Sequence, residues 1–564
     1  MRRTIATAES ILRSVRTPAT RQNCQFPRLH NGISRKSATS STSFITQIAV
    51  LAGGALIGAY ASSFFNNGKK NAKAAPGSTT SLENMPIARY NLTESNLRGA
   101  QEELTSLLTS ERVTDDLGTR IAHSSTEWSP APNGDLDRPT LVVYPLTTED
   151  VSGIAKICHK RRIPMIAFSG GTSLEGTLAM TTQGGVCIDF SRMNKVLALH
   201  KADLDVVVQP GVGYEDLNSQ LAKEGLFFPP DPGPGAQIGG MISQGCSGTN
   251  AYRYGTMKDW VLGLTIVLAD GSVVKTRHRP RKSSAGYNLT QLIVASEGTL
   301  GLVTEASLKL TGKPEVEKVA VASFPTTHKA VETVLKIVQN DLPVAAIELL
   351  DDVTMGAVNK AGYCDKEYPE IPTLFFKFSG PENVIKEQIK KVTEFAKQSA
   401  CKSFEFSKTA DQAASLWQAR KTALWSLLAI KEKPEDNFLS ADVCVPISQM
   451  ADIIEETHTK LEESGLVGSC LGHVGDGNFH TTVLYGEHDK KKARELIKWV
   501  QKRGIEMDGT ISGEHGIGLE NRDMLCNELG MGYIDAMRHV KLALDPLCLL
   551  NPDKIFQLKF EIER

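Results

Sequence analysis

One stretch of the chain limits its possible folds more than any other. Pro232–Gly255, PGPGAQIGGMISQGCSGTNAYRYG, is dense in glycine and other small residues. A core helix or strand needs larger side chains to bury apolar surface, whereas glycines allow tight turns and close approach of the backbone to another group. The segment therefore predicts a main chain pressed against a flat, extended ligand, not an ordinary core element.

Two further glycine-rich segments occur at some distance on either side. SGGTSLEG, Ser169–Gly176, directly follows a predicted strand, and its N–H groups can form a concave phosphate-binding loop. EGTLGLVTEASLKL, Glu297–Leu310, is the third segment. The motif G-x-G-x-x-G occurs nowhere in the chain, so a Rossmann-type nicotinamide site has no support.

Hydrophobic periodicity predicts an α+β fold, because strands and helices alternate without a longer repeat. The first region begins near Thr140 with a strand, a helix from Thr148 and a second strand that leads into SGGTSLEG. Asp270-Gly271 predicts a hairpin turn. From about Val316, two strand–helix–strand units predict a ferredoxin-like sheet. The predicted strands are 141–144, 163–168, 186–190, 206–209, 261–268, 272–276, 319–324, 347–350 and 373–378, and the helices include 97–108, 214–224, 328–340 and 382–398.

Composition narrows the class of protein. The chain has 564 residues, 41% hydrophobic and 23% charged, which is enough for more than one core. Its formal net charge of -1 gives no electrostatic reason to expect nucleic acid as a partner. The 10 cysteines form no C-x-x-C pair, so we expect free thiols, mostly in the core.

The N-terminus differs from the rest of the chain. Before Glu83 the only acidic residue is Glu9. Residues 1–43 contain seven arginines, Lys36 and many Ser and Thr. This composition is typical of a mitochondrial transit peptide. Residues 44–65 carry no charge, and as a helix they would span ~33 Å, enough for a bilayer core. Basic residues lie mainly before this segment, so its N-terminal side should face the matrix. The segment therefore predicts an inner-membrane anchor, with the rest of the protein, its body, in the intermembrane space. Alternatively, cleavage after the segment would release the body from the membrane.

GHVGDGNFH, Gly472–His480, is the most informative local pattern. If Asp476-Gly477 forms a two-residue turn, His473 faces His480 across the hairpin. Directly opposite Cβ atoms lie ~5 Å apart, so the two imidazoles could bind one metal ion.

SGEHGIG, Ser512–Gly518, offers the remaining groups. Glu514 can complete a site of two histidines and a carboxylate, which leaves open positions as a catalytic metal requires. Zinc fits these ligands, and iron or manganese would also fit. The alternative is that these histidines are only hydrogen-bonded surface or core residues.

The order and spacing of the three glycine-rich segments resemble the flavin domain of the vanillyl-alcohol oxidase and p-cresol methylhydroxylase superfamily. Within it, the chain resembles the branch of cytochrome-linked D-lactate dehydrogenases and D-2-hydroxyglutarate dehydrogenases, from about Thr140 to the end. The resemblance implies FAD, bound noncovalently because Thr172 stands where covalent relatives often carry a histidine. It also implies metal ligands at His473, His480 and Glu514, and a catalytic base at His515.

The resemblance places the flavin on three loops. The first would wrap the pyrophosphate, the second would lie along pyrophosphate, ribose and flavin, and the third would contact or support the adenine half. The predicted contacts are Ser169, Gly170, Gly171, Thr172 and Ser173; Pro232, Gly235, Gly239, Gly240, Ser243, Gly248, Thr249, Tyr254 and Gly255; and Glu297, Gly298, Gly301 and Val303.

The chemistry explains why these parts belong together. Oxidation of a 2-hydroxy acid removes a hydroxyl proton and a hydride from one carbon. Flavin can accept the hydride, a histidine can take the proton, and a chelating metal ion can lower the hydroxyl pKa. A guanidinium suits the substrate carboxylate, and Arg420 in LWQARKTALW matches the family's arginine, although it could be a helix-surface residue. Asn478 is a further candidate for binding the substrate or a metal ligand.

These hypotheses give five segments: the transit peptide, the anchor at 44–65, a linker with a helix at 66–139, an FAD-binding domain at 140–315 and a substrate and metal domain at 316–564.

In the 2-hydroxyglutarate branch a lysine precedes the aspartate of a stretch like SADVCVP by two residues. Ser440 stands there, ahead of Asp442, which favours a short acid such as D-lactate. By analogy, cytochrome c would accept the electrons.

Three alternatives remain open at this point. The first is a D-2-hydroxyglutarate dehydrogenase, with the same chemistry on a longer acid. The second is a non-redox transferase, because alkylglycerone-phosphate synthases share the flavin fold but lack the histidine hairpin and Glu-His pair. The third is a non-catalytic, membrane-tethered flavin or metal binder.

Overall fold

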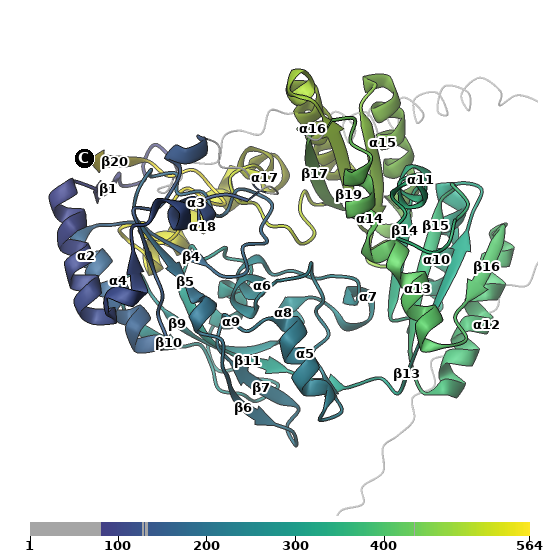
Figure 1. Ribbon diagram of the computed structural model, residues 1–564, viewed down its shortest axis with the longest axis horizontal. Coiled ribbons are helices and arrows are strands. Elements are labelled where there is room, and N and C mark those ends of the chain that lie inside the picture. The colour runs from purple at the N-terminus through teal and green to yellow at the C-terminus, as the bar shows by residue number, and fades with distance from the viewer. Residues whose placement is uncertain (1–80, 127–128, 130–132, 434) are drawn as a thin grey trace, which may run out of the picture. The chain divides into compact units, whose positions relative to one another are not determined.

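The computed structural model of the chain describes residues 81–126, 129, 133–433 and 435–564, which belong to one compact unit (Figure 1). The predicted transit peptide at 1–43 and anchor at 44–65 lie outside the described residues, as does the first part of the linker. Within the described ranges, no helix has the length and apolarity needed to cross a membrane. The nine cysteines in these ranges are free thiols, as expected.

The first half contains a small, mainly parallel sheet that leads into the SGGTSLEG loop. β3 and β4 both pair in parallel with β5, and the helix α4 connects β3 to β4. Thr147 caps α4 by accepting from the Asp150 amide, and acidic residues follow in the first turn, as the sequence indicates. The elements are β2 (Val113–Thr114), β3 (Leu141–Val143), α4 (Thr148–Arg161), β4 (Met165–Phe168) and β5 (Val186–Asp189).

A second sheet in the same half is antiparallel, with the order β10-β9-β11-β7-β6. Asp270-Gly271 forms the predicted hairpin between β9 and β10, and Gly271 has a φ of 85°. The strands are β6 (Val196–His200), β7 (Asp205–Val208), β9 (Val261–Val267), β10 (Val273–Lys275) and β11 (Leu302–Lys309). The glycine-dense segment contributes only the short helices α6 (Ile238–Gln244) and α7 (Ala251–Tyr254) before α8 (Met257–Trp260).

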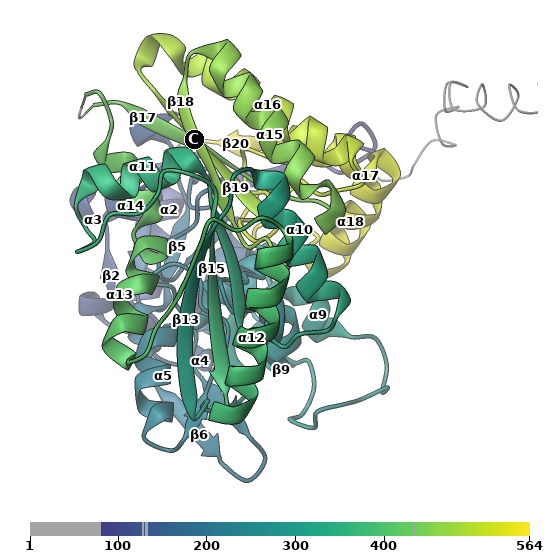
Figure 2. The same ribbon diagram turned by 90° about the vertical axis from the view of Figure 1, so that its right-hand side faces the viewer.

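The second half contains a seven-stranded sheet, and the predicted ferredoxin-like unit forms one side of it. Four strands follow the order β16-β13-β15-β14, all antiparallel to their neighbours. The helices α10 and α12 cover one face, and α13 covers the other (Figure 2). The elements are β13 (Val316–Ser323), α10 (Thr327–Gln339), β14 (Ala346–Leu350), α11 (Asp352–Ala361), β15 (Thr373–Gly380), α12 (Glu382–Gln398), β16 (Ser403–Phe406), α13 (Ala410–Lys421) and α14 (Ala423–Ala429).

A second, similar unit extends the sheet through the pairing of β14 with β18. Its strands follow the order β18-β19-β17. The position of a fourth strand, on the free edge of β17, is taken by residues 510–512, which bridge to Asp442 and Cys444. The elements are β17 (Asn437–Cys444), α15 (Met450–Ser464), β18 (Val467–Gly472), β19 (Asn478–Tyr485) and α16 (Lys490–Glu506). This edge segment leads directly into Glu514 and His515.

Both ends of the described chain differ from the expected boundaries. The folded region begins well before Thr140, because β1 (Ala88–Asn91) pairs in parallel with β20 (Phe560–Glu563), and α2 (Glu94–Leu108) packs on α4. At the other end, the yellow C-terminal segment of Figure 1 lies against the first half and contributes Leu549 and Leu550 to its core. The C-terminal segment therefore completes the first half although it follows the second in sequence.

Candidate active site

The predicted two-residue turn between the histidines is wrong. The loop between β18 and β19 has five residues, 473–477, and His480 pairs with Leu471 instead of facing His473. The loop closes when the Asp476 amide donates to the His473 carbonyl, 3.1 Å away. Gly477, with φ +90°, accepts from the Val445 amide through its carbonyl, so the tip docks on the end of β17. Docking onto a third strand, which the Asp-Gly signal does not encode, sets the register.

The two imidazoles nevertheless meet, with ring centroids 5.4 Å apart. Oε1 of Glu514 lies 3.3 Å from Nε2 of His473 and 3.4 Å from Nε2 of His480. Ligand atoms about 2.0–2.1 Å from a tetrahedral zinc ion are themselves about 3.3–3.4 Å apart. The spacing of the three predicted ligands therefore fits one divalent cation, with coordination positions left for other ligands.

Glu514 reaches the histidines because of Asp442, a buried residue on β17. Its Oδ2 accepts from the Glu514 amide at 2.7 Å and from the His515 amide at 2.8 Å. Its Oδ1 accepts from Nδ2 of Asn478 at 2.8 Å and lies 3.4 Å from Nδ1 of His480. One carboxylate thus binds the backbone of the Glu-His segment and the side chain of the asparagine, and it approaches one of the histidines predicted to bind metal.

A second buried carboxylate, Glu348 on β14, contacts Nδ1 of His473, just as Asp442 approaches Nδ1 of His480. Its Oε1 accepts from Nδ1 of His473 at 2.8 Å, and its Oε2 accepts from Nε of Arg420 at 2.8 Å. Carboxylates on the outer nitrogen of a metal-binding histidine fix its tautomer and orientation. Arg420 is therefore no isolated surface residue of α13, because Glu348 connects its Nε to His473, a predicted metal ligand.

The surroundings shift the protonation equilibria of the site. Burial would raise the pKa of Glu348, but the positive charges of His473 and Arg420 outweigh burial and lower it. Burial opposes the ionisation of Glu514 as well, whereas hydrogen bonds from His473 and His480 hold its pKa well below its usual range. Without a metal ion, these carboxylates are therefore held ionised by protonated imidazoles, because the same contacts raise the pKa of His473 well above its usual value. A divalent cation bound between these groups would replace the imidazolium protons.

His515 lies beside this cluster, with its ring stacked on that of His480 at 4.9 Å between centroids and 8° between planes. Burial opposes its protonation, but Asp442 and Glu175 raise the pKa of His515 to about 9. Oδ1 of Asn478 and Nδ1 of His515 are buried without a hydrogen-bond partner in the described part of the chain. The unsatisfied oxygen of Asn478, next to three potential ligands, is available to a bound polar molecule.

The predicted flavin loops come together in the structure. A Cβ on Gly170 would lie 2.6 Å from the Gly235 carbonyl, so the first loop packs on the second. The amide of Glu297 donates to the carbonyl of Ser243 at 2.8 Å, which joins the second loop to the third. Gly235 has φ +80° and is exposed, with no neighbour within 4 Å of its potential Cβ. The three loops thus fit the backbone cradle expected for FAD.

Several residues predicted to contact the flavin also have partners within the protein. The side chains with such partners are Ser169 (to Gln237, 2.8 Å), Ser173 (to Thr177, 2.9 Å) and Thr249 (to Asp231, 2.6 Å), and Glu297 accepts from the amides of Ile517 and Gly518. The carbonyl of Tyr254 accepts from Trp260, and Gly301 and Val303 are buried at the start of β11. Thr172 is exposed, Pro232, Gly171, Gly240 and Gly255 are partly exposed, and Gly239, Gly248 and Gly298 are buried.

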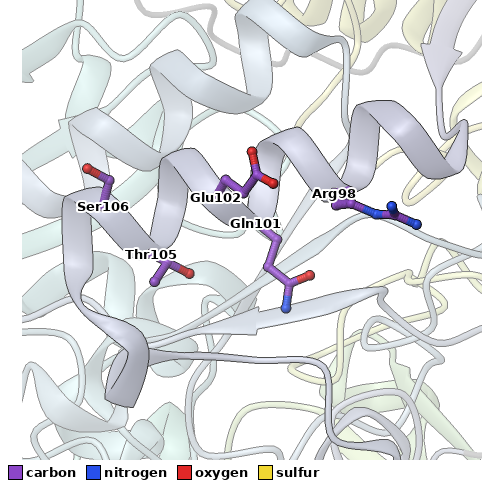
Figure 3. Close-up of a pocket in the computed structure, with 5 residues that line it drawn as sticks. All are labelled: Arg98, Gln101, Glu102, Thr105 and Ser106. Atoms are coloured by element: carbon purple, nitrogen blue, oxygen red, sulfur yellow. The ribbon is translucent and has the colours of Figure 1, made fainter.

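A hollow on the outer surface is separate from this site. It lies along α2 (Figure 3) and is lined by Arg98, Gln101, Glu102, Thr105 and Ser106. These residues belong neither to the predicted flavin loops nor to the histidine cluster, so we assign the hollow no part in the chemistry.

Comparison with known proteins agrees with the fold and the cluster. The model of the FAD binding domain matches residues 139–277, and the model of the FAD linked oxidases C-terminal domain matches residues 313–555. In solved structures, 4-ethylphenol oxidase from Gulosibacter chungangensis is similar with a TM-score of 0.69, at 20% identity, over 83% of this chain and 98% of that one. The fold is therefore that of the vanillyl-alcohol oxidase type, and the class is the FAD-linked oxidases.

The relatives narrow this class further. The mitochondrial D-lactate dehydrogenase [cytochrome] of Kluyveromyces lactis is 49% identical over 78% of this chain and 77% of that protein. D-lactate dehydrogenase [cytochrome] 1 of Saccharomyces cerevisiae, also mitochondrial, is 45% identical over 79% and 77%. The chain belongs to the family of the mitochondrial, cytochrome-linked D-lactate dehydrogenases.

Proposed function

We propose that this protein oxidises D-lactate to pyruvate with FAD and passes the electrons to a cytochrome. The observation that carries the proposal is the convergence of His473, His480 and Glu514 beside His515, in a fold whose three glycine-rich loops can hold FAD. The names of the relatives at 45–49% identity support the substrate and the acceptor.

Each side chain has a role in this proposal. When bound, FAD accepts the hydride from the carbon that carries the hydroxyl. His473, His480 and Glu514 would hold a divalent cation, with zinc as a good fit, which would acidify the substrate hydroxyl. The raised pKa of His515 favours a protonated imidazole, and a divalent cation held by Glu514 and His480 would lower that pKa so that His515 can take the hydroxyl proton. Oδ1 of Asn478, which has no hydrogen-bond partner among the described residues, can orient the substrate. Arg420 binds the substrate carboxylate with the terminal amines that its Glu348 contact leaves available.

A short substrate fits the face of β17. Ser440 and Asp442 are two residues apart on this strand and therefore share a face. The serine provides no cation for a second carboxylate, so D-lactate is favoured over D-2-hydroxyglutarate. The non-redox transferase is disfavoured, because two histidines and a carboxylate at metal-binding distances have no use in that reaction.

Anaerobic bleaching of the bound flavin tests the proposal. D-lactate should reduce the flavin much faster than L-lactate or D-2-hydroxyglutarate, and dialysis against a chelator should slow the reaction until zinc or manganese is restored. His515→Ala should slow reduction by about 100-fold or more while FAD stays bound. Equal rates with D- and L-lactate, or no effect of His515→Ala, would contradict the proposal.

The location proposal rests on the sequence of residues 1–65 and on the mitochondrial relatives. The protein would be imported into mitochondria, anchored by residues 44–65 and exposed to the intermembrane space. In isolated mitochondria the body should resist added protease, and it should become accessible when only the outer membrane is ruptured. Resistance after that rupture would place the body in the matrix.

A further inference from the structure

Two buried glutamates of the predicted flavin loops face the loop that follows His515. Glu175 is the last residue but one of the first flavin loop, and Glu297 begins the third. The Glu297 carboxylate accepts from the amides of Ile517 at 2.6 Å and Gly518 at 2.9 Å. Its position is therefore explained by support of this loop, whereas the carboxylate of Glu175 has a different partner.

Oε1 of Glu175 lies 3.6 Å from Nδ1 of His515. Both side chains are buried, with 8% and 16% of their surface exposed. The distance is slightly too long for a hydrogen bond, but Nδ1 has no other partner in the described ranges. Catalytic contacts are often loose before the substrate binds and tighten in the complex. A small rotation of either side chain would complete this contact.

The backbone keeps this pair in place. The carbonyl of Glu175 accepts from the Leu519 amide at 2.7 Å. Gly518, with φ +51°, passes so close that a Cβ there would lie 1.9 Å from the same carbonyl. The two loops therefore interlock around the point where the carboxylate meets the imidazole, and the juxtaposition is a built feature.

We propose that Glu175 is a positioning residue, which binds Nδ1 of His515 and so leaves Nε2 as the nitrogen that accepts the substrate proton. This inference rests on the proposed role of His515 as the base. Asp442 accepts from the backbone amide of His515 and its carboxylate lies within 4.8 Å of the ring, while His480 stacks on that ring. Glu175 is the carboxylate that approaches Nδ1, at 3.6 Å. A carboxylate on the far nitrogen of a catalytic histidine selects its tautomer in other enzymes.

Glu175→Gln tests the proposal in the holoenzyme, because it keeps the shape of the side chain and removes its charge. The rate constant of anaerobic flavin reduction by saturating D-lactate should fall at least about 10-fold, while the apparent Kd for D-lactate changes little. In a His515→Ala background, the same substitution should cause almost no further loss, because Glu175 acts through that ring. Asp205→Asn is the matched control, since Asp205 is a buried carboxylate 2.7 Å from Nδ1 of His200, remote from the site.

The outcomes separate this inference from the proposed function. If the wild-type protein is reduced by D-lactate and His515→Ala is slow, but Glu175→Gln is as fast as wild type, the proposal for Glu175 is overturned. Independent, additive losses in the double variant would overturn it as well. If Glu175→Gln fails to retain FAD, Glu175→Asp replaces it. That variant keeps the charge but withdraws the oxygens, so a slower reduction supports the proposal and a wild-type rate refutes it.

Discussion

At the scale of residues, the site is a row of side chains whose charges can alternate in sign. Arg420 contacts Glu348, Glu348 contacts His473, and His473 shares Glu514 with His480, which approaches Asp442. Buried charges are stable only when each has a partner. The row therefore orients both imidazoles with their Nε2 atoms toward Glu514, and the removal of one member should disturb its neighbours.

Glu348→Gln removes the charge between Arg420 and His473. We expect the affinity for the metal ion to fall about 10- to 100-fold, because the carboxylate no longer orients the imidazole. FAD content should stay at the wild-type level. The measurement is the metal retained per flavin after dialysis against graded chelator, with Glu305→Gln on β11 as the control. Wild-type retention would show that Glu348 does not support the metal ligand.

Arg420→Lys tests the arginine as the group that binds the substrate carboxylate. A lysine cannot contact Glu348 and also offer two parallel donors. The KM for D-lactate should rise about 10-fold or more, with a smaller change in kcat. Lys421→Arg, the reverse exchange at the exposed neighbouring position on α13, should leave both constants unchanged. An unchanged KM in Arg420→Lys would remove the arginine from this role.

The sequence predicted which side chains would meet, but not what orients them. His473, His480, Glu514 and His515 come together as predicted from two short motifs, each of which combines glycines with unusual polar residues. Glu348 gives only a weak signal, a lone carboxylate among the apolar residues of β14. Its partners are 72 and 125 residues away, and no local pattern encodes such contacts.

At the scale of elements, the two histidines of the hairpin lie close together as predicted, although the predicted strand register was wrong. Asp476-Gly477 predicts a two-residue turn, whereas the real loop is longer because its tip binds the end of β17. The ferredoxin-like unit was predictable because its helices and strands have strong periodicity. The contribution of residues 510–512 to the edge of β17 was not, since three residues carry no periodic signal.

Gly477→Ala tests the docking of the loop. A Cβ there would lie 2.2 Å from the Val445 carbonyl, and φ is +90°. The left-handed backbone costs about 1–2 kcal/mol for alanine, and the collision adds to it, so a clear fall in Tm and in metal retention is expected. Gly465→Ala, at φ +68° with open space around it, should lower Tm less and leave metal binding intact. Equal effects in the two variants would mean that the docked tip is unimportant.

At the scale of the whole molecule, the chain returns from the second half to the first in its last residues. The Met165 amide donates to the Leu549 carbonyl at 2.7 Å, and the Asn551 amide donates to the Met165 carbonyl at 2.7 Å. Residues 549–551 thus lie beside β4, the strand that leads into the first flavin loop. Periodicity predicts local elements but not which sheet a terminal segment joins, so the boundary at residue 316 does not separate two independent bodies.

Leu549→Ala should therefore weaken flavin binding from a position near the C-terminus. Leu549 is fully buried in the core formed by β3, β4, β5 and α4. Its truncation should cost about 2–5 kcal/mol and lower the temperature at which flavin fluorescence is released. Leu529→Ala, with 40% of the residue exposed on α17 (Arg522–Leu529), should change stability by no more than about 0.5 kcal/mol. Leu549→Ala could instead leave the temperature of flavin release unchanged and lower only metal retention. That result would mean that the C-terminal segment stabilises the seven-stranded sheet and not the flavin-binding half. A joint loss of flavin and stability would show that the last residues of the chain complete the fold that binds the cofactor.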